Sequence, residues 1–129
     1  MLDLIADIKQ YPQFLSWCTD SIIIKDNGSV VDAQLVITVA GIKQKFSTRN
    51  TMEGERLSMQ LIEGPFKQLS GYWLCHQLGD LGCKIELKLD FDFSSGLLNH
   101  AFAKGFGHVA GRLLQDFCQH ADDLYGSAG

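Results

Sequence analysis

The sequence has little of what membrane-spanning and exported proteins carry. Its 129 residues contain no apolar run close to the roughly 18 residues that a helix needs to span a bilayer. Asp3, Asp7 and Lys9 interrupt the apolar pattern at the start of the chain, which excludes an ordinary signal peptide. We therefore expect a cytoplasmic protein that folds as a single domain over residues 1–129.

Reactive motifs are equally scarce. The cysteines stand at positions 18, 75, 83 and 118 and form no C-x-x-C pair, so we expect buried thiols rather than a metal or redox site. The histidines, at positions 76, 100, 108 and 120, are never four residues apart, which argues against a metal pair on one helix. No G-x-S-x-G motif and no glycine-rich phosphate loop occurs. The pattern predicts no catalytic residue and no metal ligand.

The net charge of −4 argues against long-range attraction to nucleic acid. A local basic patch is still compatible with it. Glu86, Asp90 and Asp92 could be interpreted as catalytic carboxylates, but Lys84 and Lys88 share their face of one predicted strand. A solvated, charge-mixed surface explains that face better.

Two strong patterns lie near the end of the chain. Residues 83–93 alternate between apolar and polar side chains, which predicts a strand with one buried face. A helical stripe then recurs at spacings of three and four residues, formed by Leu98, Phe102, Phe106, Val109, Leu113, Phe117, Ala121 and Leu124. Gly105, Gly107 and Gly111 interrupt this helix, and the close approach of the sheet backbone or of a ligand would offset their cost; of the two we expect close helix–sheet packing.

The rest of the chain indicates short elements joined by short turns. We expect a helix over residues 2–8, a second short helix opened by Pro12, and strands over 21–26, 30–39, 42–51, 57–61 and 66–78. Turns are expected at Asn27-Gly28, Ala40-Gly41 and residues 79–82, and fraying from Gly126. Strands joined in this way form an antiparallel meander.

Aromatic side chains from several elements share the expected interior. They are Phe14, Trp17, Phe46, Trp73, Phe91, Phe102 and Phe106, and either a packed core or a ligand cavity would explain them. Gln44, Thr48 and Asn50 fall on the inward phase of their strand, where a polar group needs a partner. Lys43, Lys45 and Arg49 form a basic stripe on the outward phase, compatible with an ordinary solvated face or with a phosphate contact.

Several segments together resemble a known family. They are residues 11–18 (YPQFLSWC), residues 46–50 (FSTRN), residues 64–66 (GPF), the L-x-G-x-W pattern of residues 69–73, and the strand over residues 85–93. In this order they resemble the coenzyme Q-binding and ribosome-association-toxin branch of the START-like superfamily, which is also described as polyketide cyclase/dehydrase-like. The resemblance covers nearly the whole chain.

The resemblance implies an α+β helix-grip fold (START/Bet v 1-like), a curved antiparallel sheet around the C-terminal helix that encloses a lipid-sized cavity. It implies no cofactor, and a ubiquinone-like lipid as ligand in support of respiratory quinone function. The residues expected to contact that ligand are Phe14, Trp17, Leu35, Ile37, Phe46, Thr48, Met59, Leu61, Trp73, Phe91, Phe102, Phe106 and Val109.

Two other functions stay open at this point. One is a toxin-like factor that binds the large ribosomal subunit and blocks subunit association, with Lys43, Lys45 and Arg49 contacting the ribosome or a lipid headgroup. The other is a cyclase or dehydrase acting on an aromatic polyketide, for which the residues offer no convincing acid or base. Peripheral membrane contact is a further expected interaction.

The chain also departs from the resemblance. Relatives usually begin with an additional strand, which lies between the first and last strands expected here. Without it, two strand edges would be unpaired. We therefore expect Met1 to be an internal residue of a longer protein, or else strand exchange or homodimer formation to fill the gap.

Overall fold

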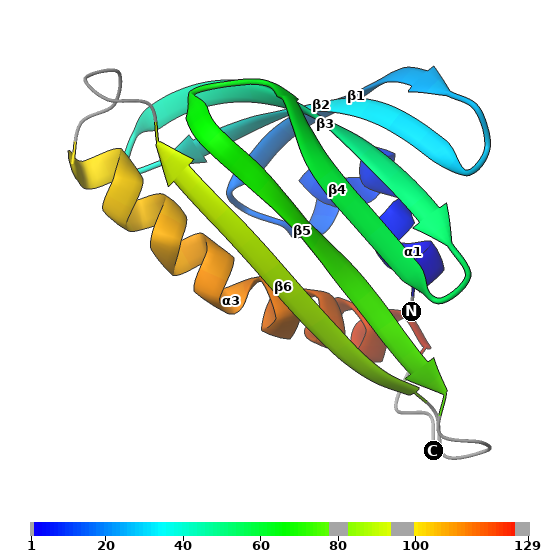
Figure 1. Cartoon of the computed structure of the whole chain (residues 1–129). Coiled ribbons are helices and arrows are strands. Elements are labelled where there is room, and N and C mark those ends of the chain that lie inside the picture. Colours follow the sequence, from blue (N-terminus) through cyan, green and yellow to red (C-terminus); the bar gives the residue numbers. More distant parts are fainter. Residues whose placement is uncertain (1, 78–82, 94–99, 126–129) are drawn as a thin grey trace.

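The computed structural model describes residues 2–77, 83–93 and 100–125. In chain order its elements are α1 (Leu2–Ala6), the 3₁₀ turn η1 (Ile8–Gln10), α2 (Tyr11–Phe14), β1 (Cys18–Asp26), β2 (Val30–Val39), β3 (Ile42–Glu53), β4 (Arg56–Glu63), β5 (Phe66–Gln77), β6 (Cys83–Phe93) and α3 (His100–Tyr125). The strands form one sheet in the order β1-β2-β3-β4-β5-β6. The sheet curves around α3, as Figure 1 shows. The predicted α+β helix-grip architecture is thus confirmed.

The hairpin turns follow from local chemistry. Gly28 has a φ of 88°, and the Asn27 N–H donates to the Val30 carbonyl over 2.9 Å. Ala40 and Gly41 have φ values of 53° and 77°, so both central residues of the β2–β3 turn are left-handed. Such turns match the twist of the flanking strands. Both predicted turns are confirmed.

The N-terminal segment is more broken than predicted. A continuous helix over residues 2–8 is wrong, because α1 ends at Ala6 and Asp7 leaves the helical region with ψ of 70°. The break lets the Tyr11 hydroxyl donate to the Ile5 carbonyl, which a continuous helix would engage itself. Pro12 lies in the first turn of α2, as predicted.

The strand β1 begins earlier than predicted, at Cys18 rather than at residue 21. Cys18 pairs with Ile37, and the Thr38 N–H donates to the Trp17 carbonyl over 2.9 Å. A β-bulge between Cys18 and Asp20 explains the error, because the extra residue breaks the alternation.

The helix α3 covers the concave side of the sheet with the predicted aromatic stripe. Phe102, Phe106, Phe117 and Ala121 are all buried. Leu124 is 55% exposed, so its place in the buried stripe is wrong. The reason is that α2 packs on α3 through Phe14, whose contacts with Phe117 and His120 come before that last turn. Leu98 lies outside the described residues.

Of the three helix glycines, Gly105 alone approaches the sheet closely. A Cβ at Gly105 would overlap Cγ1 of Val39, whereas a Cβ at Gly107 or Gly111 would meet open space. The packing expected for all three therefore holds for Gly105 and is wrong for the other two.

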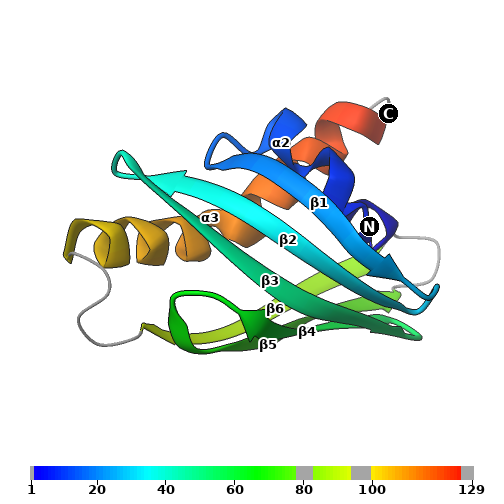
Figure 2. The ribbon, with the colours of Figure 1, turned by 90° about the horizontal axis from the view of Figure 1, so that it is seen from above.

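The two edges of the sheet are β1 and β6, the strands that the resemblance indicates. Figure 2 shows α1 and α2 on the β1 side, beside the C-terminal half of α3. The turn expected at residues 79–82 and the tail from Gly126 lie outside the described residues.

Candidate ligand-binding cavity

An apolar cavity lies between the concave face of the sheet, α3 and the N-terminal helices. Its volume is about 80 Å³. Its walls are Ile8, Tyr11, Trp17, Leu35, Phe46, Thr48, Asn50, Leu57, Met59, Leu69, Trp73, Leu89, Phe106, Val109, Ala110, Leu113 and Phe117. Ligand pockets of about 300–1,000 Å³ are usual, so a lipid would have to widen this one.

Aromatic contacts hold the cavity walls together. The ring of Phe117 packs edge-on against Tyr11 at 5.2 Å and against Trp73 at 5.1 Å. Further along α3, Phe106 lies 5.1 Å from Phe66 and 5.0 Å from Phe91. All of these pairs are edge-to-face except Phe106 with Phe66, which is tilted by 60°, and such ring contacts favour a defined wall over a loosely packed one.

Few polar groups reach the cavity. Asn50 Nδ2 donates to the Thr48 hydroxyl over 3.1 Å and to the Val31 carbonyl over 3.2 Å. The Thr48 hydroxyl accepts this bond and keeps its own hydrogen for a second partner. Trp17 Nε1 is buried and has no hydrogen-bond partner among the described residues. These groups suit the orientation of a mostly apolar ligand.

The titratable groups at the cavity are held neutral. Burial raises the pKa of Tyr11 well above its ordinary value, and its hydroxyl is engaged with the Ile5 carbonyl. Burial also raises the pKa of the neighbouring Cys18 thiol to about 11. A protonated thiol is a poor nucleophile, so neither group is activated for chemistry at neutral pH.

A more polar groove lies outside the cavity, between α2 and α3. It measures about 350 Å³ and is lined by Phe14, Leu15, Ser16, Trp17, His108, Val109, Arg112, Asp116, Gln119, His120 and Asp123. Trp17 and Val109 line both spaces. These two side chains therefore form the wall that separates the cavity from the outer groove.

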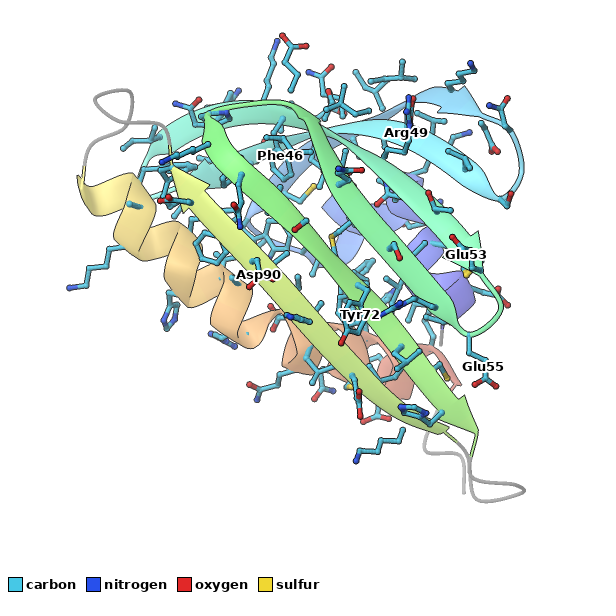
Figure 3. All side chains as sticks on the ribbon, viewed as in Figure 1. Phe46, Arg49, Glu53, Glu55, Tyr72 and Asp90 are labelled. Carbon is cyan, nitrogen blue, oxygen red and sulfur yellow. The ribbon has the colours of Figure 1, made fainter. Side chains whose placement is uncertain are left out.

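The basic stripe lies on the outer face of β3. Lys43 and Lys45 are exposed. Arg49 lies on the same face (Figure 3), but its Nε and Nη2 donate to the two oxygens of Asp32, each over 2.9 Å. Arg49 is thus partly neutralised, which leaves Lys43 and Lys45 as the unpaired charges of the stripe among the described residues.

The described histidines and carboxylates form no metal-binding group. His76 lies 3.5 Å from Glu86 on the exposed face, and His120 stacks on Phe14 with ring centroids 3.6 Å apart. Among the residues that the structure describes, no three His, Cys, Asp or Glu side chains converge. The side chain of His100 lies outside that part.

Comparison with known proteins identifies the family. Residues 1–118 match the model of the family described as polyketide cyclase / dehydrase and lipid transport. The chain belongs to this family. The resemblance noted in the sequence is thus confirmed.

Individual relatives differ in what their names say. The ribosome association toxin RatA of Pseudomonas aeruginosa is 37% identical over 127 residues, which cover 98% of this chain and 88% of that protein. The mitochondrial coenzyme Q-binding protein coq10 of Schizosaccharomyces pombe is 22% identical over 129 residues, 94% of this chain and 77% of its own. The Zhui aromatase/cyclase of Streptomyces sp. R1128 has the same fold, with a TM-score of 0.79 at 16% identity, and the match covers 98% and 88% of the two chains.

Most of the residues that were predicted to contact the ligand line the cavity of this family member. They are Trp17, Leu35, Phe46, Thr48, Met59, Trp73, Phe106 and Val109. The others lie elsewhere: Ile37 and Phe102 are fully buried in the core, Leu61 and Phe91 pack beside it, and Phe14 lines the outer groove. An inward strand phase does not show which inward side chains border free space.

Several cavity residues were not among the predicted contacts. They are Ile8, Tyr11, Asn50, Leu57, Leu69, Leu89, Ala110, Leu113 and Phe117. Leu57, Leu69 and Leu89 share the inward phase of their strands, so the alternation carried that signal. Tyr11 and Ala110 depend on how the helices turn against the sheet, which the sequence pattern does not record.

No helix in the described part of this family member is long and apolar enough to cross a bilayer.

Proposed function

We propose that the protein binds an apolar ligand of the isoprenoid quinone type within the cavity and carries or shelters it without chemical change. The observation that supports this most directly is the apolar cavity with a buried indole N–H at one wall. The kinship with a coenzyme Q-binding protein supports the choice of quinone.

Binding without catalysis fits the groups at the cavity. Thr48 and Asn50 can donate and accept hydrogen bonds and Trp17 can donate one, but none of the three is an acid or base near neutral pH. Tyr11 stays protonated because burial raises its pKa. A cyclase would need a placed proton acceptor, and the described residues that line the cavity include no His, Asp, Glu or Lys.

Native mass spectrometry followed by organic extraction tests this function. The protein is purified from a quinone-producing host, beside a form that carries the upstream genomic codons. We expect a quinone or similar lipid to co-purify at up to one molecule per chain. Ligand-free protein in both forms would contradict the proposal.

The name shared by several relatives supports a second candidate. A protein 37% identical to this chain is called a ribosome association toxin, and we propose contact with the large ribosomal subunit as the alternative function. The exposed Lys43 and Lys45 on the outer face of β3 suit contact with RNA phosphates.

The double substitution Lys43→Glu and Lys45→Glu separates this candidate from the first. We expect loss of co-sedimentation with large subunits and unchanged lipid binding, because the stripe lies on the face opposite the cavity. Lys84→Glu with Lys88→Glu makes the same charge change on β6 and serves as the control. Equal co-sedimentation of the unsubstituted protein and the two double variants would rule out the basic stripe as the ribosome contact.

A further inference from the structure

The indole of Trp17 stands between the apolar cavity and the outer groove with its N–H unsatisfied. Nε1 is buried and has no hydrogen-bond partner in the described part of the chain. We propose that this N–H recognises an acceptor atom, such as a carbonyl oxygen, on the neutral polar head of the ligand. This inference rests on the proposed ligand-binding function and assigns to Trp17 the hydrogen bond to the polar head of the ligand.

The position of Trp17 is fixed by the fold. Its carbonyl accepts from the Thr38 N–H over 2.9 Å, and the Cys18 N–H donates to the Leu15 carbonyl over 3.0 Å. The segment between α2 and β1 is therefore held at both sides of the tryptophan. An acceptor that reaches Nε1 when the cavity widens would therefore meet a donor whose backbone is already held in place, which is the preorganisation that favours binding.

The polar and apolar groups of the cavity wall lie at different distances from Trp17 along the sheet. Trp17 joins β2 at Thr38, whereas Thr48 and Asn50 lie further along the sheet, beside Ala33 and Val31. Met59 on β4 lies opposite Asn50, and Leu57, the next inward residue of β4, lies opposite Trp73 on β5. A head at Trp17 thus leaves the apolar length of the cavity to a hydrocarbon tail.

The charges around the groove favour a neutral head over an anionic one. Arg112 lies 3.8 Å from Asp116 on the next turn of α3, so its charge is already countered. Asp123, which accepts from Gln119 over 3.1 Å, adds a second carboxylate, while His120 is stacked on Phe14 and His108 is exposed. A carboxylate or phosphate head would meet two acids against one paired guanidinium, whereas a quinone carbonyl brings no charge.

The test compares two probes on two matched variants. The probes are a decyl-substituted benzoquinone and decylbenzene, which carries the same tail on a flat six-membered ring of similar size but has no carbonyl acceptor. Trp17→Phe removes the N–H and keeps an aromatic ring, and Trp73→Phe makes the same change on the tail side of the cavity. Affinities are measured by competition from neutral vesicles.

We expect Trp17→Phe to weaken quinone binding about tenfold and to leave decylbenzene binding within about twofold of the unsubstituted protein. Trp73→Phe should affect both probes equally, because it alters contact area with the tail. Equal loss of both probes in Trp17→Phe, or loss of neither, would overturn the inference while leaving ligand binding itself intact. Failure of the unsubstituted protein to bind either probe would overturn the proposed function instead.

A second measurement does not depend on the variants folding well. The Trp17 indole N–H resonance of the unsubstituted protein should move downfield on addition of the quinone and stay within line width on addition of decylbenzene. Decanoate serves as the anionic probe, and we expect it to bind at least tenfold more weakly than the quinone. Equal shifts with quinone and decylbenzene, or tighter binding of decanoate, would contradict the assigned head chemistry.

Discussion

Asp32 is a carboxylate whose side chain is 11% exposed on the outer face of the sheet, held by two hydrogen bonds from Arg49. These bonds, followed by the charge of Arg49, hold the pKa of Asp32 below its usual range. A carboxyl with a lower pKa in the folded than in the unfolded state stabilises the fold above the unfolded pKa of about 3.9. That stabilisation is lost as the pH falls through the folded pKa.

We therefore expect Asp32→Asn to lower the free energy of unfolding at pH 7 and to matter less below about pH 4. Urea unfolding at several pH values measures the difference. Asp90→Asn is the control, because the Asp90 side chain is about half exposed and its carboxylate lies as far as 4.0 Å from the Lys88 ammonium. An ion pair of this kind adds little to stability. A difference between Asp32→Asn and the unsubstituted protein that does not change with pH would show that the pair acts through packing instead.

At the scale of single residues, the sequence predicted side-chain phase better than side-chain role. The inward placement of Phe46 and Thr48 and the outward placement of Lys45 and Arg49 follow from the two-residue period of a strand. The orphaned N–H of Trp17 could not be predicted, because it depends on which polar groups other segments bring near. The Arg49–Asp32 pair needed the register of β2 against β3, which alternation alone does not fix.

At the scale of elements, α3 contains glycines in two different surroundings, one packed against the sheet and others facing open space. Gly105→Ala should destabilise the protein by about 1–3 kcal/mol, because the new Cβ would overlap the stiff Val39 side chain. Gly107→Ala, with open space around its Cβ, should stabilise by about 0.5–1 kcal/mol through helix propensity. Urea unfolding of the two variants checks this contrast. Similar effects of both substitutions would mean that the helix can slide on the sheet without cost.

The elements show why the sequence placed strands more accurately than helix ends. Long alternating stretches predicted β2 and β6 with their observed bounds. The bulge at the start of β1 and the break at Asp7 are one-residue irregularities. They are accompanied by single hydrogen bonds, from the Thr38 N–H to Trp17 and from the Tyr11 hydroxyl to Ile5. Irregularities that depend on single hydrogen bonds leave no period in the sequence.

At the scale of the whole molecule, stability and ligand capacity compete for the same space. Ala110→Leu places a larger side chain in a cavity of about 80 Å³. We expect the ligand-free protein to gain about 1 kcal/mol in unfolding free energy, because apolar free space is filled. We also expect it to lose the rise in Tm that a bound quinone gives the unsubstituted protein.

Thermal unfolding with and without the decyl-substituted quinone measures both effects. Gln115→Leu adds the same side chain at an exposed position of α3 and should keep the ligand-induced rise. An undiminished rise in Ala110→Leu would place the ligand outside this cavity.

The order of the strands has a consequence for how the protein is made. Because each strand pairs with the one before it, the sheet can assemble hairpin by hairpin as the chain emerges. Its concave face, however, is covered by α3, whose 26 residues are synthesised after every strand. At about 5–20 residues per second, translation of α3 takes about 1–5 s. Every newborn molecule therefore presents an open apolar trough for seconds, a stage at which a chaperone or a nearby lipid can meet the cavity before its helix closes it.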